Sequence, residues 1–225
     1  MDRRCLLFPI LLLAGCGRGA PEPAPGAAPP APKPAAPAPP ADPRPVIAAF
    51  GDSLTAGHGV EPGLGYPEFL QKELDRAGYA YRVVNLGISG DTSGGGLSRL
   101  DTALSLKPAV VILELGANDG LRGLPLASTR QNLDEMIRAF QGAGAKVLLA
   151  GITLPRNYGP DYIRGFEAVY RDLAKQYRIA FLPFLLQGVA TDPKLMQGDR
   201  LHPTAEGNRR VAAHVWKSLR PLLAR

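Results

Sequence analysis

The chain has 225 residues, with 26 lysines and arginines against 20 aspartates and glutamates, a formal net charge of +6. The excess is small and the basic residues form no run, which argues against nucleic-acid binding. Only two cysteines, Cys5 and Cys16, are present, so a disulfide framework is excluded and the fold must rely on its hydrophobic core.

The amino terminus has the pattern of an export signal. Residues 1–4 are largely charged, residues 5–13 are mostly apolar, and small residues follow up to Cys16. The apolar stretch is shorter than the roughly 20 residues of a membrane-spanning helix. Residues 13–16 read Leu-Ala-Gly-Cys and resemble the lipobox of bacterial lipoproteins, which implies a signal peptide over 1–16 and a lipidated Cys16. Ordinary signal cleavage that leaves Cys16 as a free thiol is the alternative.

The residue after Cys16 bears on the destination of such a lipoprotein. Gly17 stands where an aspartate retains many bacterial lipoproteins in the inner membrane. We therefore expect an exported, membrane-anchored protein on the periplasmic side, at the outer rather than the inner membrane.

A linker and one domain make up the remaining chain. Residues 17–45 are nearly all proline, alanine and glycine, and such a composition predicts a disordered, partly extended linker. In polyproline geometry, at about 3.1 Å per residue, its reach is at most roughly 90 Å. Residues 46–225 have the length of a single domain and contain no internal repeat.

In chain order, the domain alternates between short apolar runs typical of buried strands and longer amphipathic stretches typical of helices. Strands are expected over residues 46–50, 79–86, 109–115, 146–152 and 179–184. Helices are expected over residues 65–78, 97–107, 126–142, 162–177 and 203–222. This alternation predicts an α/β fold, with helices on both faces of a central parallel sheet. Three strands end in polar, glycine-rich loops that must gather at one edge: residues 51–57, 87–94 and 116–120.

The first of these loops places Ser53 directly after an apolar strand. Gly51 allows a sharp turn, and Asp52 or Ser53 can cap a following helix. Open α/β sheets carry their sites at the carboxyl ends of the strands, which makes Ser53 a candidate nucleophile. A serine that only caps a helix is the alternative.

A serine nucleophile needs a base, and the domain contains three histidines. Asp199 and His202 stand three residues apart before the last expected helix, a spacing at which one carboxylate can orient the imidazole. His58 has no acid at a comparable spacing, and His214 lies inside the closing helix. We therefore predict that His202 is the base and Asp199 its partner; a plain helix cap is the alternative for Asp199.

The other two loops offer donors for an oxyanion. Asn118 carries a side-chain amide at the end of the most apolar strand, and Gly90 allows close backbone approach in a left-handed conformation. The backbone N–H of Ser53 is the third candidate. Taken singly, Asn118 and Gly90 would be ordinary turn residues.

Together these motifs resemble the SGNH (GDSL) hydrolase family, named for its Ser, Gly, Asn and His residues. The resemblance runs from about residue 46 to the C terminus and is strongest to the bacterial branch of thioesterase I, lysophospholipase L1 and arylesterase. The stretches that carry it cover residues 51–54, 88–93, 114–116, 118–123, 154–159 and 199–202.

This resemblance implies a flavodoxin-like, three-layer α/β/α sandwich and a serine hydrolase that needs no metal or other cofactor. It assigns Ser53 as nucleophile and Asp199 with His202 as acid and base. It assigns Ser53, Gly90 and Asn118 as the oxyanion hole. One departure is Ala117, where the branch often has a second glycine.

The substrate is expected to be an acyl ester or thioester, hydrolysed through an acyl-serine intermediate by a monomeric enzyme. Apolar residues near the loops favour an acyl groove over a sugar cleft, although they could also be ordinary core. The substrate-binding candidates are Leu121, Leu124, Leu154 and Pro155. Two alternatives remain open: an O-acetyl esterase of cell-wall or exported polysaccharide, and a non-catalytic lipid-binding lipoprotein.

Overall fold

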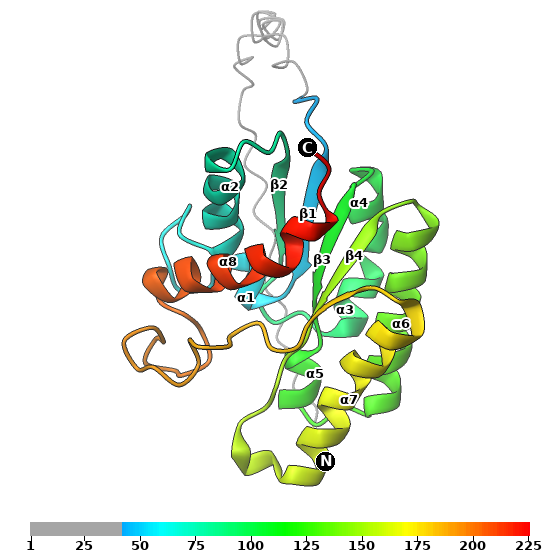
Figure 1. Ribbon diagram of the computed structural model, residues 1–225. Coiled ribbons are helices and arrows are strands. Elements are labelled where there is room, and N and C mark those ends of the chain that lie inside the picture. Colours follow the sequence, from blue (N-terminus) through cyan, green and yellow to red (C-terminus); the bar gives the residue numbers. More distant parts are fainter. Residues whose placement is uncertain (1–41) are drawn as a thin grey trace, which may run out of the picture. The chain divides into compact units, whose positions relative to one another are not determined.

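The computed structural model describes residues 42–225, so the expected signal peptide, Cys16 and most of the linker lie outside the described residues. Within residues 42–225, a five-stranded parallel sheet has the order β2-β1-β3-β4-β5 (Figure 1). None of the helices in this part combines the length and apolar character that a membrane span requires. The strands are β1 (Val46–Gly51), β2 (Arg82–Gly87), β3 (Val110–Glu114), β4 (Lys146–Ala150) and β5 (Ala180–Leu182).

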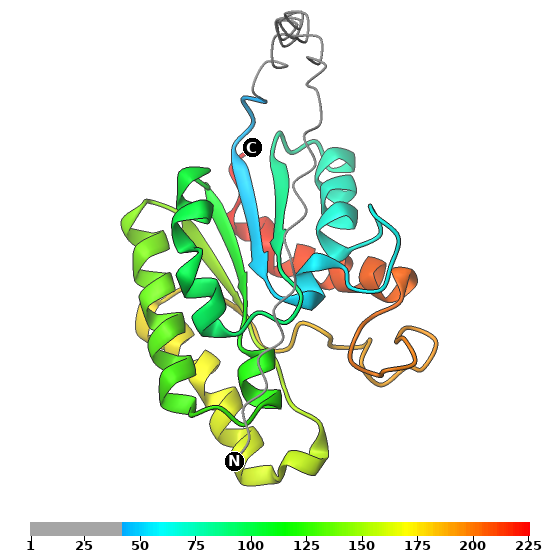
Figure 2. The ribbon, with the colours of Figure 1, turned by 180° about the vertical axis from the view of Figure 1, so that it is seen from behind.

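Helices cover both faces of the sheet, which confirms the three-layer α/β/α sandwich. α2 packs against α8, and α6 packs against α3 and α7. α8 crosses in front of the sheet in Figure 1 and behind it in Figure 2, while α3, α4 and α6 lie on the opposite face. The helices are α1 (Ser53–Ala56), α2 (Tyr66–Arg76), α3 (Ser93–Ser98), α4 (Leu100–Ser105), α5 (Ala117–Leu121), α6 (Leu126–Gly142), α7 (Pro160–Tyr177) and α8 (Ala205–Leu219), with 3-10 turns η1 (Arg156–Tyr158) and η2 (Arg220–Leu222).

The strand order creates a crevice at one edge of the sheet. The chain leaves β1 toward β2 and then returns past it to β3, so the connections after β1 and β3 lie on opposite faces. Such a reversal opens a crevice beyond the carboxyl ends of the two strands, where ligands of open α/β sheets bind. α1 follows β1 and α5 follows β3, which brings both short helices to this crevice.

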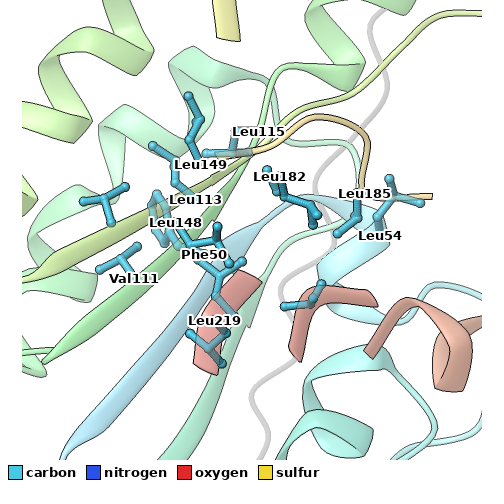
Figure 3. Close-up of a cluster of buried hydrophobic side chains, with 14 of the residues drawn as sticks. Phe50, Leu54, Val111, Leu113, Leu115, Leu148, Leu149, Leu182, Leu185 and Leu219 are labelled. Carbon is cyan, nitrogen blue, oxygen red and sulfur yellow. The ribbon is translucent and has the colours of Figure 1, made fainter. Parts of the chain in front are cut away.

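The strands that flank the crevice are anchored in the core. Every residue of β1 and of β3 is buried, as expected for strands covered on both faces. Figure 3 shows Phe50 of β1, Leu113 of β3 and Leu148 of β4 in one apolar cluster with Leu219 of α8. Full burial of each such side chain contributes about 1.5–3 kcal/mol, so the ends of these strands are rigidly held.

One expected helix differs from its prediction. The helix expected over 97–107 is two short helices, α3 and α4, which meet at Arg99. α3 begins with the sequence Ser-Gly-Gly-Gly, which has low helix propensity. For this reason the start of the helix could not be predicted from propensity. The hydroxyl of Thr92 accepts the N–H of Gly95 at 3.1 Å and caps this helix.

The predictions for one strand start and for one loop were also wrong. The strand expected from residue 79 begins at Arg82, because the N–H of Tyr79 donates to Leu74 and still belongs to the end of α2. The segment 116–120 was expected to be a loop, yet α5 occupies most of it. Gly116, with φ of +112°, makes the turn from β3 into this helix.

Candidate active site

Three polar side chains from opposite ends of the domain sequence meet at the crevice. Ser53 begins α1, and its Oγ lies 2.8 Å from Nε2 of His202. Nδ1 of the same ring lies 2.6 Å from Oδ2 of Asp199. With the ring proton on Nδ1 and donated to Asp199, Nε2 can accept the proton of the Ser53 hydroxyl. The arrangement can therefore activate Ser53 as a nucleophile.

The loop before α8 orients Asp199. Its Oδ1 accepts the N–H groups of Leu201 at 2.9 Å and of His202 at 3.0 Å. Burial alone would raise the pKa of Asp199, but hydrogen bonds from the His202 ring and from these two N–H groups outweigh it and lower the pKa to about 2. Asp199 is therefore a carboxylate at neutral pH, and its charge favours an imidazolium at His202.

Local sequence explains the position of Ser53. The Asp52 carboxylate accepts the N–H of Leu54 at 3.0 Å and caps α1, so Asp52 is the cap of the two candidate residues. Gly57, with φ of +74°, ends the helix after a single turn. A helix this short leaves Ser53 half-buried at the crevice rather than packed beneath it.

Gly90 and Asn118 line the same cavity as the serine. Gly90 has φ of +86°, a conformation that a glycine adopts without the strain of a side chain. Asn118 lies in α5, and its Nδ2 donates to the carbonyl oxygen of Asp91 at 2.8 Å and to Oδ2 of Asp52 at 3.2 Å. The structure thus brings both predicted oxyanion donors to the nucleophile.

Arg99 fixes the segment that carries Asp91. Its Nε donates to the Asp91 carboxylate at 2.6 Å, and its two terminal nitrogens donate at 2.8 Å to the carbonyl oxygens of Leu86 and Gly51. The guanidinium also lies over the Phe50 ring, 4.1 Å from the ring centroid. One side chain therefore ties the ends of β1 and β2 to the loop that supports Asn118.

A pair of buried carboxyl groups lies beneath the site. Oε2 of Glu114 accepts the backbone N–H of Asp52 at 3.3 Å and the hydroxyl of Thr55 at 2.8 Å. Burial, and then the nearby charge of Asp52, raise the pKa of Glu114 well above its usual value. Burial raises the pKa of Asp52 to about 6. At neutral pH the pair therefore carries one negative charge, on Asp52.

Sequence reasoning missed the contact that joins the histidine loop to the nucleophile. Nε2 of Gln197 donates to the carbonyl oxygens of His58 at 2.7 Å and of Pro203 at 2.9 Å. The rings of His58 and His202 lie 4.5 Å apart between centroids, and Nδ1 of His58 lies 3.3 Å from Oγ of Ser89. His58 is thus a neighbour of the catalytic candidates without a carboxylate of its own among these contacts.

His214 lies in α8 and takes no part in this cluster of side chains. Its Nε2 lies 3.2 Å from the carbonyl oxygen of Phe184. Burial lowers the pKa of His214. This agrees with a packing role.

A cavity of about 440 Å³ adjoins the serine, and its lining is mostly apolar. Three of the four predicted substrate-binding residues, Leu121, Leu154 and Pro155, line it. Leu124 is not among its lining residues, so the cavity gives this part of the prediction no support. Gly123, with φ of +65°, turns the chain after α5 and leaves Leu124 37% exposed. The other large apolar lining residues are Leu54, Ile152, Phe184, Leu186, Met196 and Leu201.

The fold has a central parallel sheet, and a serine, a histidine and an aspartate are hydrogen-bonded in series at its crevice, beside an apolar cavity. These features define a serine hydrolase. Comparison with known proteins agrees with this class. The GDSL-like Lipase/Acylhydrolase family model matches residues 49–210, and the chain belongs to this family.

Individual relatives narrow the class further. Esterase TesA of Pseudomonas aeruginosa is 49% identical over 178 residues, which cover 79% of this chain and 89% of the relative. Thioesterase 1/protease 1/lysophospholipase L1 of Escherichia coli strain K12 is 40% identical over 178 residues, 79% of this chain and 84% of the relative. A crystal structure of TesA matches with a TM-score of 0.77 at 48% identity, over 79% of this chain and 99% of the solved chain. The chain is therefore an ester-hydrolysing enzyme with the SGNH-hydrolase fold.

Proposed function

We propose that Ser53, His202 and Asp199 form the catalytic triad of a serine esterase that acts on acyl esters and thioesters. The observation that carries this assignment is the chain of hydrogen bonds, at 2.8 Å from Ser53 Oγ to His202 Nε2 and 2.6 Å from His202 Nδ1 to Asp199. The names of the relatives, an esterase and a thioesterase/lysophospholipase, support ester and thioester substrates.

In the acylation half-reaction, Ser53 Oγ attacks the substrate carbonyl carbon while His202 Nε2 takes the hydroxyl proton. Asp199 stabilises the imidazolium that results. When the tetrahedral intermediate collapses, the bond to the leaving oxygen or sulfur breaks, and the imidazolium returns its proton to that atom. The acyl group remains on Ser53 as an ester.

Deacylation uses the same groups with water as the nucleophile. His202 removes a proton from the water as its oxygen attacks the acyl-serine carbonyl. The Ser53–acyl bond then breaks, the serine regains the proton from His202, and the carboxylic acid leaves. Each step needs only protein groups and water.

The oxyanion of both intermediates lies among three donors: the N–H groups of Ser53 and Gly90 and the amide of Asn118. Loss of one such donor typically slows turnover by roughly 10²–10³. The carbonyl oxygen of Gly90 accepts Nη2 of Arg122 at 2.9 Å, and this bond holds the loop that carries the Gly90 N–H.

The lining of the cavity favours an acyl chain as the part of the substrate that is recognised. Leu121, Leu154 and Pro155 line it together with other apolar side chains. A second candidate, O-acetyl esterase activity on cell-wall or exported polysaccharide, would leave much of this apolar volume unfilled. The enzyme acts as a monomer in this proposal.

Location follows from the amino-terminal sequence, which lies outside the described residues. The export-signal pattern and the Leu-Ala-Gly-Cys sequence support a lipid on Cys16 and a periplasmic enzyme held at the outer membrane. Cys16→Ser should then move the protein from the membrane fraction to the soluble fraction. A membrane fraction that remains unchanged after a high-salt wash would rule out lipidation as the anchor.

The catalytic proposal is tested with a panel of esters from acetyl to palmitoyl, together with an acyl-CoA and a lysophospholipid. Ser53→Ala should abolish turnover of every substrate, and a fluorophosphonate probe should label Ser53 in the wild type only. Asn118→Ala should keep a reactive serine but slow turnover by roughly 10²–10³. Faster turnover of the acetyl ester than of every longer acyl substrate in the panel would favour the polysaccharide alternative.

A further inference from the structure

Exposed apolar residues lie in or next to the segments that line the cavity. Within residues 42–225, three large hydrophobic residues are strongly exposed: Ile88 at 49%, Leu201 at 40% and Leu124 at 37%. Leu201 lines the cavity, Ile88 precedes the cavity-lining Ser89, and Leu124 follows the cavity-lining Leu121 by three residues. Single exposed hydrophobic residues are common on protein surfaces, but three at one edge form a pattern that needs a cause.

Arginines stand among these apolar residues. Arg200 lines the cavity, Arg122 donates to the carbonyl of Gly90, and Arg156 follows the cavity-lining Pro155. All three arginines are exposed, and in the described part of the chain none of them forms an ion pair. Their charge is therefore available to an anionic partner.

The backbone conformation of Arg200 is a further sign that this arginine has a function. It has φ of +58°, in the left-handed region that a non-glycine residue rarely adopts. Such conformations persist where the surrounding structure holds them, and they cluster at functional sites. Here the conformation places a cation two residues before His202.

The segments that carry these residues lie toward one end of the described domain. Figures 1 and 2 place α1, α5 and the chain after β4 at the end toward which the strands run, and the C terminus at the opposite end. The first described residues also lie at that opposite end, because β1 begins there. The cavity and the first described residue, Asp42, therefore lie at opposite ends of the described domain.

We propose that this edge is a membrane-docking surface, whose occupant is the headgroup region of an anionic lipid bilayer. The apolar side chains insert below the headgroups while the arginines contact lipid phosphates, the combination that binds proteins to membrane surfaces. The cavity opens within this surface, so an acyl chain can enter it directly from the lipid. The inference goes beyond the proposed function and holds for any acyl substrate. The docking rim consists of Ile88, Arg122, Leu124, Arg156, Arg200 and Leu201.

The test uses residues 42–225, without the linker and Cys16. The solved TesA chain is covered to 99% by the matched region, which shows that a chain of this extent folds by itself. Co-sedimentation is measured with vesicles of phosphatidylcholine alone and with phosphatidylglycerol added. Wild-type protein should bind the anionic vesicles more strongly than the neutral ones, and added salt should weaken this binding.

Apolar insertion is tested with the double variant Ile88→Ser/Leu124→Ser, whose two positions lie outside the cavity lining. Partitioning into anionic vesicles should fall by about tenfold or more. Leu223→Ser is a control away from the mouth, since the adjoining Leu222 accepts a hydrogen bond from Lys146 at the start of β4. Leu223 is partly buried against the core, so thermal unfolding must first show that this variant is folded. Equal partitioning of the rim variant and this control would overturn the proposal.

The charge contribution is tested with Arg156→Gln, and Arg220→Gln in η2 is its control. Arg156→Gln should weaken binding to anionic vesicles by about fivefold and leave binding to neutral vesicles unchanged. Absence of vesicle binding by the wild type would overturn the proposal and leave a protein partner as the occupant of the rim. Hydrolysis of a soluble acetyl ester by the same samples reports separately on the proposed esterase function, so failure of one does not imply failure of the other.

Discussion

Nδ2 of Asn118 lies 3.2 Å from the buried carboxylate of Asp52 and 2.8 Å from the carbonyl oxygen of Asp91. An amide nitrogen has two N–H groups, so both are engaged in the absence of substrate. In the proposed mechanism, a developing oxyanion would therefore compete with the longer of the two bonds, the one to Asp52. We infer that Asp52 acts as a positioning residue, which holds the amide until the oxyanion replaces its carboxylate.

Asp52→Asn tests this relationship. The new amide oxygen can still cap α1 through Leu54, but the new NH2 group presents donors to the donors of Asn118. We expect kcat/KM for a short aryl ester to fall by about 10–10²-fold, less than the roughly 10²–10³ that complete loss of one oxyanion donor brings. The double variant Asp52→Asn/Asn118→Ala should be no slower than Asn118→Ala, because both changes act through one amide. Losses that multiply would contradict a shared pathway.

Glu114 makes stability depend on pH in a defined direction. A carboxyl group whose pKa is higher in the folded than in the unfolded state binds its proton more tightly when folded. Its contribution to stability is therefore present at low pH and lost as pH rises through the folded value. For Asp52 the loss extends from about pH 4 to about pH 6, and for Glu114 it continues to higher pH.

Glu114→Gln imitates the protonated acid and removes the contribution of this group. The unfolding free energies of variant and wild type should be similar in mild acid. Above the usual glutamate pKa of 4.5, the wild type should lose up to about 1.4 kcal/mol per pH unit relative to the variant, until Glu114 ionises in the folded state. Urea unfolding across the neutral range measures the difference. Parallel curves would show that Glu114 does not keep its proton in the folded protein.

The grouping of Ser53, Asn118 and His202 could be predicted from the sequence because each residue belongs to a short motif at an expected loop. In a parallel α/β fold the ends of strands meet at one edge, so topology supplied the distances that the motifs lacked. Gly90 could be predicted in the same way, because glycine is the residue that adopts a positive φ without strain.

Other features depend on contacts that no local pattern contains. Gln197 reaches the carbonyl oxygen of His58 across 139 residues of sequence. Glu114 lies in the most apolar strand and was predicted only as part of that strand. A lone carboxyl group in such an apolar run was nevertheless a signal that this group is buried. Leu124 was predicted as a substrate-binding residue because it is apolar and lies in the segment after Asn118, and the turn at Gly123 leaves it outside the lining of the cavity.

The choice of base is tested by comparing three histidine variants on one short ester. His202→Ala should lower turnover by several orders of magnitude, because this ring alone connects the serine to a carboxylate. His58→Ala removes a ring that lies tilted beside His202 and contacts Ser89, and His214→Ala removes a contact with Phe184, so both should retain most activity. An inactive His58→Ala enzyme beside an active His202→Ala enzyme would reverse the assignment.

The cavity boundary leads to a prediction about chain-length selectivity. Leu121 lines the cavity and Leu124 does not, although the two are only three residues apart on either side of Gly123. Each methylene group of a substrate that is buried against apolar surface contributes about 0.8 kcal/mol. Leu121→Ser should therefore lower turnover of a long-chain ester by about tenfold more than turnover of an acetyl ester.

Leu124→Ser is the matched control and should leave this ratio unchanged. Substrate concentrations are kept below those at which the esters aggregate, and vesicles are left out. Leu124 belongs to the docking rim, so a lipid surface would add an effect of membrane docking to the measured ratio. Thermal unfolding of each variant shows whether the fold survives the change. An equal loss on both esters in Leu121→Ser would point to damage of α5, which also carries Asn118. A changed ratio in Leu124→Ser would mean that the acyl chain extends past the turn at Gly123, beyond the cavity described here.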